Sequence, residues 1–162
     1  MSATTLPTTP VVTRAVASDV PQLVALNNQF SADGLTLPRT EAFVFEHLQD
    51  YQVIRGPDGD VIGCVCVDEY SPSVAELVSL AVAPAAQGKG YGKLLIRAAE
   101  RLARKRGYPE LFAISLADTL FLAMGFEESH IARYPEKINR YKAISKSELS
   151  IGKKFCFTRR LG

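Results

Sequence analysis

The chain has 162 residues, of which 47% are hydrophobic and 22% are charged, and its formal net charge is +2. This length and composition predict one domain with its own core, which we assign to residues 11–162. So mild a charge gives no indication of nucleic-acid binding, and no segment reaches the roughly 18 consecutive apolar residues of a membrane span. We therefore expect a cytoplasmic protein with neither nucleic acid nor a membrane as its partner.

The N-terminal segment and the cysteines do not predict a binding site. Residues 1–10 are rich in Thr and Pro and lack the basic and apolar regions of a signal peptide, so we expect a disordered tail. Cys64 and Cys66 lie two residues apart in a strand-like run and share one face of it, which favours small core residues. A zinc site would need more ligands at suitable spacing, and we predict no metal site.

The first half of the chain predicts a strand, two helices and then three strands joined by hairpins. Ser18-Asp19 is a good helix cap ahead of apolar positions at helical spacing, and Thr40 caps a second short helix. The segment Gly56-Pro57-Asp58-Gly59-Asp60 has the composition of a hairpin turn. The predicted strands are Val11–Ala15, Tyr51–Arg55, Val61–Asp68 and Val74–Val82.

A glycine-rich segment, Gln87-Gly88-Lys89-Gly90-Tyr91-Gly92, separates the strand Val74–Val82 from an amphipathic helix at Tyr91–Arg106. Glycines let backbone amides crowd a phosphate at a helix N-terminus, so we predict a site for the pyrophosphate of a nucleotide-containing cofactor. Lys93 stands where a dinucleotide-binding turn needs its third spaced glycine, and neither Ser nor Thr follows the glycines as in a phosphate loop.

The predicted helix at Tyr91–Arg106 is basic on one face. Seven Lys or Arg residues lie between Lys89 and Arg106 against one acid, Glu100. Two interpretations stay open: a solvated helix face, or a field that attracts a polyanionic ligand. Further along the chain, we predict a strand at Leu111–Ser115 parallel to the strand before the glycines, a short helix capped by Asp118 or Thr119, and a last strand at Lys154–Arg159.

The pattern of Gln87, Gly90 and Gly92 between a strand and a helix resembles the signature of the GCN5-related N-acetyltransferase superfamily. The returning strand at Leu111 and the pair Gly125-Phe126 also fall where that superfamily has them. The resemblance implies an α+β fold, with a mixed, mostly antiparallel sheet flanked by helices and a parallel strand pair splayed to hold the cofactor. It implies acetyl-coenzyme A as the cofactor and a small-molecule amine or amino acid as the acceptor. Homodimers are common in that superfamily, although no sequence feature here indicates one.

By this resemblance, the amides of residues 87–93 bind the pyrophosphate and backbone groups of Leu80 to Val82 pair with the pantetheine arm. The Val82 amide would face the thioester oxygen. An edge opened by splaying two parallel strands offers unpaired amides to an extended ligand, which fits this interpretation. The predicted cofactor-binding residues are Leu80, Ala81, Val82, Gln87, Gly88, Lys89, Gly90, Tyr91, Gly92 and Lys93.

A closer resemblance is to the acetyltransferase domain of N-acetylglutamate synthases, and it implies roles for three further residues. Arg39 would hold a substrate carboxylate, Glu76 would serve as the base through water, and Ser115 would lie near the departing sulfur. Glutamate is the acceptor that this resemblance implies, with arginine biosynthesis as the pathway. The matching segments are Gly34–Thr40, Asp50–Val53, Ile62–Cys64, Ala75–Val82 and Leu111–Ser115.

The chemistry asks for such groups independently of the resemblance. An α-amine is mostly protonated near neutral pH, so a carboxylate must take its proton before the amine attacks the thioester. Glu76 lies in an otherwise apolar strand, where burial should raise its pKa towards that task, unless it is simply exposed. Arg39 follows Pro38 and suits bidentate carboxylate recognition, unless it is a solvent-exposed loop arginine.

One departure from the superfamily pattern and one from the synthase pattern leave alternatives open. The segment Leu116–Met124 has no tyrosine to act as the general acid, and Lys137 and Arg140 only loosely match the tail residues that bind the second carboxylate of glutamate. Besides amino-acid acetylation, we therefore consider two other functions. One is an acetyltransferase for another amine or a peptide, and the other is a non-catalytic coenzyme A-binding regulatory module.

Overall fold

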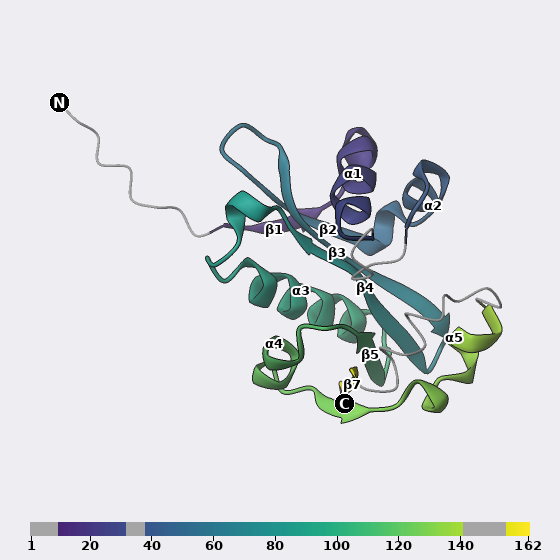
Figure 1. The fold of residues 1–162 in the computed structure, drawn as a ribbon. Helices are drawn as coiled ribbons and strands as arrows, with labels where there is room; N and C mark the ends of the chain where they lie inside the picture. The colour runs from purple at the N-terminus through teal and green to yellow at the C-terminus, as the bar shows by residue number, and fades with distance from the viewer. Residues whose placement is uncertain (1–9, 32–37, 141–154) are drawn as a thin grey trace.

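The computed structural model describes residues 10–31, 38–140 and 155–162 of the chain. Within these residues the strands form a seven-stranded sheet in the order β1-β2-β3-β4-β5-β7-β6 (Figure 1). The tail predicted for residues 1–10 lies outside the described residues apart from Pro10. The strands are β1 (Val12–Arg14), β2 (Tyr51–Arg55), β3 (Val61–Ser71), β4 (Val74–Val82), β5 (Glu110–Ile114), β6 (Glu127–Ser129) and β7 (Cys156–Arg160).

Helices cover both faces of the sheet. In Figure 1, α1 and α2 lie on one face and α3 lies on the other. The fold is therefore the α+β arrangement with a mixed, mostly antiparallel sheet that the sequence predicts. The helices are α1 (Val20–Ser31), α2 (Glu41–Glu46), α3 (Tyr91–Lys105), α4 (Asp118–Ala123) and α5 (Pro135–Arg140).

The three predicted hairpin strands are confirmed, with small differences at their ends. β2 pairs with β3 and β3 with β4, both antiparallel. β3 runs three residues beyond the predicted end at Asp68, because its pairing with β4 continues to Ser71 opposite Val74. Thr40 caps α2 as predicted, since its hydroxyl accepts a hydrogen bond from the amide of Phe43 at 3.1 Å.

The parallel pair β4–β5 is joined at one end only. The paired positions are Ala75 opposite Leu111 and Glu76 opposite Phe112, after which β4 continues to Val82 paired with β3 but not with β5. β5 instead pairs along its whole length with β7 on its other side. The two parallel strands therefore separate beyond Glu76, as the predicted fold requires.

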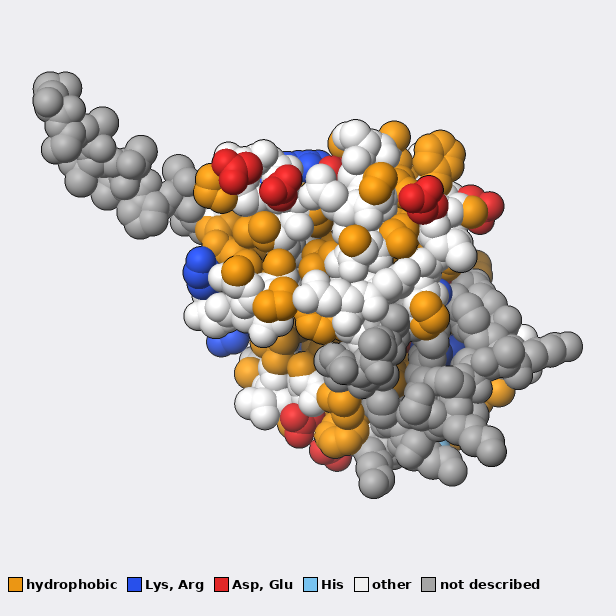
Figure 2. Space-filling model, turned by 45° about the horizontal axis from the view of Figure 1, so that its top comes forward, with side chains coloured by type: hydrophobic (Ala, Val, Ile, Leu, Met, Phe, Trp, Pro, Cys, Tyr) orange, Lys and Arg blue, Asp and Glu red, His pale blue; other side chains and the backbone are white. Residues whose placement is uncertain are grey.

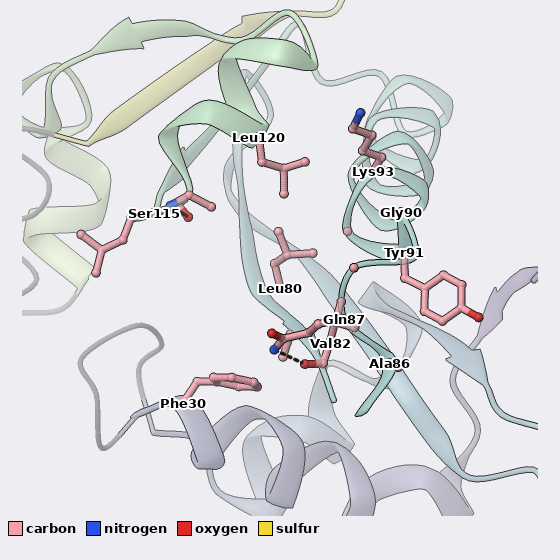
Figure 3. A pocket seen from close by; sticks show the side chains of 15 residues that line it. Phe30, Leu80, Val82, Ala86, Gln87, Gly90, Tyr91, Lys93, Ser115 and Leu120 are labelled. Carbon is pink, nitrogen blue, oxygen red and sulfur yellow. Dashed lines mark hydrogen bonds between the residues drawn. The ribbon is translucent and has the colours of Figure 1, made fainter. Parts of the chain in front are cut away.

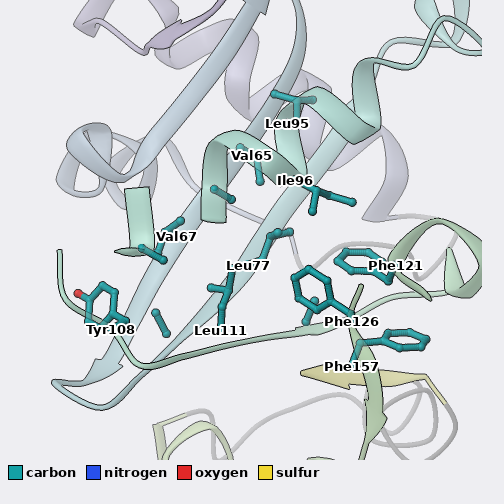
Figure 4. Close-up of a cluster of buried hydrophobic side chains, with 14 of the residues drawn as sticks. Val65, Val67, Leu77, Leu95, Ile96, Tyr108, Leu111, Phe121, Phe126 and Phe157 are labelled. Carbon is teal, nitrogen blue, oxygen red and sulfur yellow. The ribbon is translucent and has the colours of Figure 1, made fainter. Parts of the chain in front are cut away.

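Two hydrophobic clusters fix the positions of the helices. One lies between the sheet and α3, where Leu95 and Ile96 pack towards Val65, Leu77 and the phenylalanines near the C-terminal strands (Figure 4). The other lies under α1 and α2 and contains Cys64 and Cys66, both fully buried, as expected of small core residues. Burial of these side chains stabilises the fold by about 25 cal/mol for each Å² of apolar surface removed from water.

The cap predicted for α4 is wrong. The helix begins at Asp118, and the preceding Ala117 gives no side-chain hydrogen bond to the first turn. Instead the hydroxyl of Ser115 accepts a hydrogen bond from the Ala117 amide at 3.0 Å, just before the helix. This local bond fixes the turn between β5 and α4, at the place where the two parallel strands have separated.

The outer surface over α1 and α2 mixes hydrophobic and polar side chains, with acidic groups along its upper rim (Figure 2). Phe45 of α2 is among the exposed large hydrophobic residues. None of the described helices is both long enough and apolar enough to cross a lipid bilayer.

Candidate active site

A cavity of about 520 Å³ opens between the separated strands β4 and β5. Its walls come from the end of β4, the glycine-rich segment with the first turn of α3, and the segment after β5. Ser115 belongs to the segment after β5, while Phe30 of α1 and Leu120 of α4 approach the cavity from two other elements (Figure 3). The lining is mainly apolar side chains and exposed backbone, which suits an extended ligand with few charged groups along its middle.

The glycine-rich segment is shaped by two left-handed residues. Gly88 has φ 79° and Gly90 has φ 83°, a conformation that residues with a Cβ rarely adopt. Gly90 is the N-cap of α3, so the first amides of that helix point out of its end beside the cavity. Gln87 connects the glycine-rich segment to the end of β4, because its side-chain amide donates to the carbonyl of Val82 at 3.0 Å (Figure 3). This end of the cavity can therefore bind an anion through backbone amides.

A bulge in β4 lies beside the same cavity. The register slips between Cys64 and Cys66 on β3, opposite Ser79 and Leu80 on β4, and Ser79 has a φ of 54°. Two buried side chains hold Ser79: the Tyr51 hydroxyl lies 3.1 Å from its Oγ, and the Cys64 thiol donates to its carbonyl at 3.2 Å. Burial raises the pKa of the Cys64 thiol to about 12, so it remains protonated as a donor.

Glu76 lies on β4 at the point where the parallel strands part, and it is 3% exposed. The Lys137 ammonium donates to its two carboxylate oxygens at 2.9 and 2.8 Å. The Tyr70 hydroxyl donates to the Oε1 atom of the same carboxylate at 2.7 Å. Glu76 is thus a buried carboxylate with a cation and a phenol against it, and the interpretation of an exposed strand residue is excluded.

Arg39 lies just before α2 and is only 8% exposed, so the interpretation of an exposed loop arginine is also excluded. Its guanidinium carbon lies 4.2 Å from the centre of the Phe43 ring, in a cation–π contact. Its backbone is fixed by Asn28 of α1, whose side chain hydrogen-bonds to both the amide and the carbonyl of Arg39. Proximity to Tyr51 and Cys66 places its charge on the α1/α2 face of the sheet.

The predicted site residues fall into two groups in the structure. The predicted cofactor residues all line the cavity except Lys89, and Ser115 lines it as well. Glu76, Arg39 and Lys137 are not among the residues that line it. Arg140 is the last residue of α5, and its side chain lies outside the part of the chain that the structure describes.

Sequence reasoning missed Phe30 and Tyr70. Phe30 lies at the end of α1, where helical spacing alone gives no sign of a cavity. Tyr70 lies two residues past the predicted end of its strand, so its position opposite the β4 segment could not be assigned. Among the described residues there is no group of three or more His, Cys, Asp or Glu side chains that could hold a metal ion.

Comparison with known proteins agrees with this geometry. Residues 23–126 match the model of the Acetyltransferase (GNAT) family. The chain is 31% identical over 129 residues to an uncharacterised N-acetyltransferase of Chlorobaculum tepidum, covering 80% of this chain and 83% of that protein. It is 28% identical over 127 residues to an amino-acid acetyltransferase of Neisseria meningitidis serogroup A, covering 77% of this chain and only 29% of that protein.

A solved structure shares the fold over almost the whole chain. It is N-acetylglutamate synthase from Neisseria gonorrhoeae, complexed with coenzyme A and N-acetyl-glutamate. The TM-score is 0.79 at 24% identity, covering 97% of this chain and 36% of the synthase chain. The present chain therefore spans about a third of the length of that synthase.

Proposed function

The chain belongs to the acetyltransferase (GNAT) family, and on this basis we propose that it transfers the acetyl group of acetyl-coenzyme A to the α-amine of a small amino acid, with glutamate as the first acceptor to test. The observation that carries the proposal is the cavity between the separated strands, which ends at the amides of a helix N-terminus. The amino-acid acetyltransferase of Neisseria meningitidis supports the choice of acceptor. With glutamate as acceptor, the reaction would serve arginine biosynthesis in the cytoplasm.

The cofactor fits the cavity from both ends. The amides of residues 87–93 would bind the pyrophosphate, since the turn is left-handed at Gly88 and Gly90 and opens at the start of α3. Lys93 lines the cavity one turn further on and adds a positive charge. The pantetheine arm would lie along Leu80, Ala81 and Val82, where β4 has no partner strand on the β5 side within the described residues.

The acceptor would lie on the α1/α2 face of the sheet, between Arg39 and Glu76. The guanidinium of Arg39 would bind the α-carboxylate, because its planar fork matches a carboxylate in two hydrogen bonds. Glu76 would take the proton of the α-ammonium through water, since it lies on β4 four residues before Leu80 of the cavity.

These groups account for every proton and bond in the reaction. The neutral amine attacks the thioester carbon, a nitrogen–carbon bond forms and the carbon–sulfur bond breaks. Strand amides at the end of β4 would stabilise the oxyanion that forms in between. The second proton of the amine passes to the departing sulfur through solvent or the Ser115 hydroxyl, which lines the cavity.

The test is release of free coenzyme A thiol from acetyl-coenzyme A in the presence of single amino acids, polyamines or peptides. Turnover that saturates with glutamate, and falls about 10- to 100-fold in Arg39→Ala through the loss of charged hydrogen bonds, is the expected result. Arg14→Ala, which removes an exposed arginine from β1, is the matched control and should leave turnover unchanged. Turnover with polyamines alone would overturn the acceptor, and binding of coenzyme A with no turnover would indicate a regulatory module.

A further inference from the structure

The buried partner of Glu76 is a residue that the sequence alone assigns to the substrate. Lys137 was expected to bind the second carboxylate of an acidic acceptor. Its ammonium instead donates to both oxygens of Glu76, and the side chain is 1% exposed. A buried carboxylate that loses its counter-ion is strongly destabilised, so Lys137 cannot turn towards an acceptor without leaving Glu76 uncompensated.

The position of Lys137 follows from a closed set of contacts around Glu76. Phe112 on β5 is the register partner of Glu76 on β4, and the Tyr134 ring stacks on Phe112 with 3.8 Å between centroids. The amide of Lys137 donates to the carbonyl of Tyr134 at 3.1 Å, at the start of α5, which begins at the next residue after Tyr134. The lysine side chain then reaches Glu76 on β4, the strand next to the one that carries Phe112. The aromatic stack therefore sets where the ammonium lies.

Other charged and titratable groups face the pair from the neighbouring strands. Tyr70 of β3 donates to Glu76, and Asp68 is the register partner of Glu76 across β3. Cys156 of β7 lies close enough to sense both charges. The pKa of its thiol is raised to about 12, mainly by burial; the Glu76 charge also raises this pKa and the Lys137 charge lowers it. Within the described residues, Lys137 is the cation that hydrogen-bonds directly to the Glu76 carboxylate.

From these contacts we infer that Lys137 is a positioning residue for the base and not a ligand of the acceptor side chain. The inference rests on the proposed function, in which Glu76 accepts the proton of the α-ammonium. The ammonium of Lys137 compensates the buried charge of the Glu76 carboxylate and fixes its orientation, so the proton can pass to the carboxylate through water. This role also bears on the class of acceptor. Lys137 does not select for an acidic side chain, so it allows small α-amino acids with neutral side chains to be acetylated as well as acidic ones.

The experiment compares Lys137→Met with wild type on two acceptors of matched size, glutamate and glutamine. Loss of a positioning cation should lower kcat/KM for both acceptors by the same factor, about tenfold or more, mainly through kcat. The acidic limb of the pH profile should move to higher pH, because a carboxylate without its cation gains its proton more readily. Lys137→Arg keeps the charge and should recover part of the activity on both. A rise in KM for glutamate alone, with glutamine unchanged, would overturn the inference.

A readout without turnover separates this inference from the proposed function. The titration of the Glu76 carboxyl, followed by carbon-13 NMR, should move to higher pH in Lys137→Met whether or not any acceptor is acetylated. A double-mutant cycle compares the free energies of unfolding of Glu76→Gln, Lys137→Met and the double variant with that of wild type. It tests the pairing even if one single variant folds too poorly for kinetics. The double variant should be more stable than the sum of the two single losses predicts. An unchanged titration or additive losses would refute the pairing role even if glutamate is acetylated.

Discussion

The side-chain amide of Asn28 forms hydrogen bonds with both the amide nitrogen and the carbonyl oxygen of Arg39, at 2.8 and 2.9 Å. The bonds join α1 to the segment before α2, across eleven positions of sequence. They hold the backbone of Arg39 while its guanidinium rests over Phe43. Asn28 therefore fixes the residue that we expect to bind the acceptor carboxylate.

Asn28→Ala should lower the free energy of unfolding by about 1.5–4.5 kcal/mol, since it removes the two hydrogen bonds to Arg39 and the one from the Asn27 side-chain amide, at about 0.5–1.5 kcal/mol each. It should also raise the KM of the amino-acid acceptor several-fold while the KM of acetyl-coenzyme A stays close to wild type. Asn28→Asp, which keeps the acceptor for the Arg39 amide and loses the donor, should give a smaller effect. Denaturant unfolding and steady-state kinetics measure both. An equal rise of the two KM values would show that Asn28 acts on the whole fold instead.

Gly90→Ala should weaken coenzyme A binding about tenfold, because the left-handed backbone at φ 83° aims the first amides of α3. The chain offers a matched control in Gly59, which has the same φ in the turn between β2 and β3. An added Cβ meets no heavy atom within 4 Å at either site, so both variants carry the backbone strain alone.

Each of the two variants should lose about 1–2 kcal/mol of stability, the cost of a left-handed conformation for a residue with a Cβ. Thermal unfolding and calorimetric titration with coenzyme A separate the effects. Weaker binding in Gly59→Ala by the same factor would attribute the change to general destabilisation and not to the amides at the cavity.

Tyr51→Phe should cost about 1 kcal/mol of stability, the typical net worth of one hydrogen bond, because it removes the hydroxyl that faces the Ser79 Oγ. Ser79 holds the bulge of β4 beside the cavity, so the KM of acetyl-coenzyme A should rise more than that of the acceptor. Tyr108→Phe is the comparison, since that phenol is also largely buried but lies past the other end of α3. Kinetics in which both variants behave alike would contradict a role for the bulge.

Arg55→Met should destabilise the protein in a pH-dependent way. Arg55 hydrogen-bonds to both oxygens of Asp19, each at 2.6 Å, and this lowers the pKa of the Asp19 carboxyl from its usual value. A carboxyl with a lowered folded-state pKa contributes stability above its unfolded value of about 3.9, and that stability is lost as the pH falls through the folded-state pKa. The difference in unfolding free energy between wild type and variant should therefore be constant near neutral pH and shrink in acid. A difference that grows below pH 4 would refute the assignment.

The sequence was enough to predict the turns and caps whose conformation depends on residues close to one another in the chain. The hairpin turn at Gly56–Asp60, the Thr40 cap and the glycines at 88 and 90 each act within a few residues, so their spacing is enough to place them. The separated strand pair was predicted through the family resemblance, and the register of β4 and β5 confirms it.

The surroundings of Glu76 could not be predicted in the same way. Lys137 lies 61 positions further along the chain, in a six-residue helix that follows segments too short to show a period. The bulge at Ser79 is also invisible in sequence, because Tyr51 and Cys64 act on it from two other strands. Side chains that meet only when the sheet has formed decide both features.

The short pairing between β4 and β5 also affects how strongly the two parts of the sheet are held together without a ligand. Within the described residues, β1 to β4 and β5 to β7 are two leaves of one sheet that share the register positions at Ala75 and Glu76. An extended ligand bound along β4 beyond Glu76, where β5 does not pair with it, would connect the two parts of the sheet. The free energy of ligand binding would then also appear as an increase in the free energy needed to separate the two parts of the sheet.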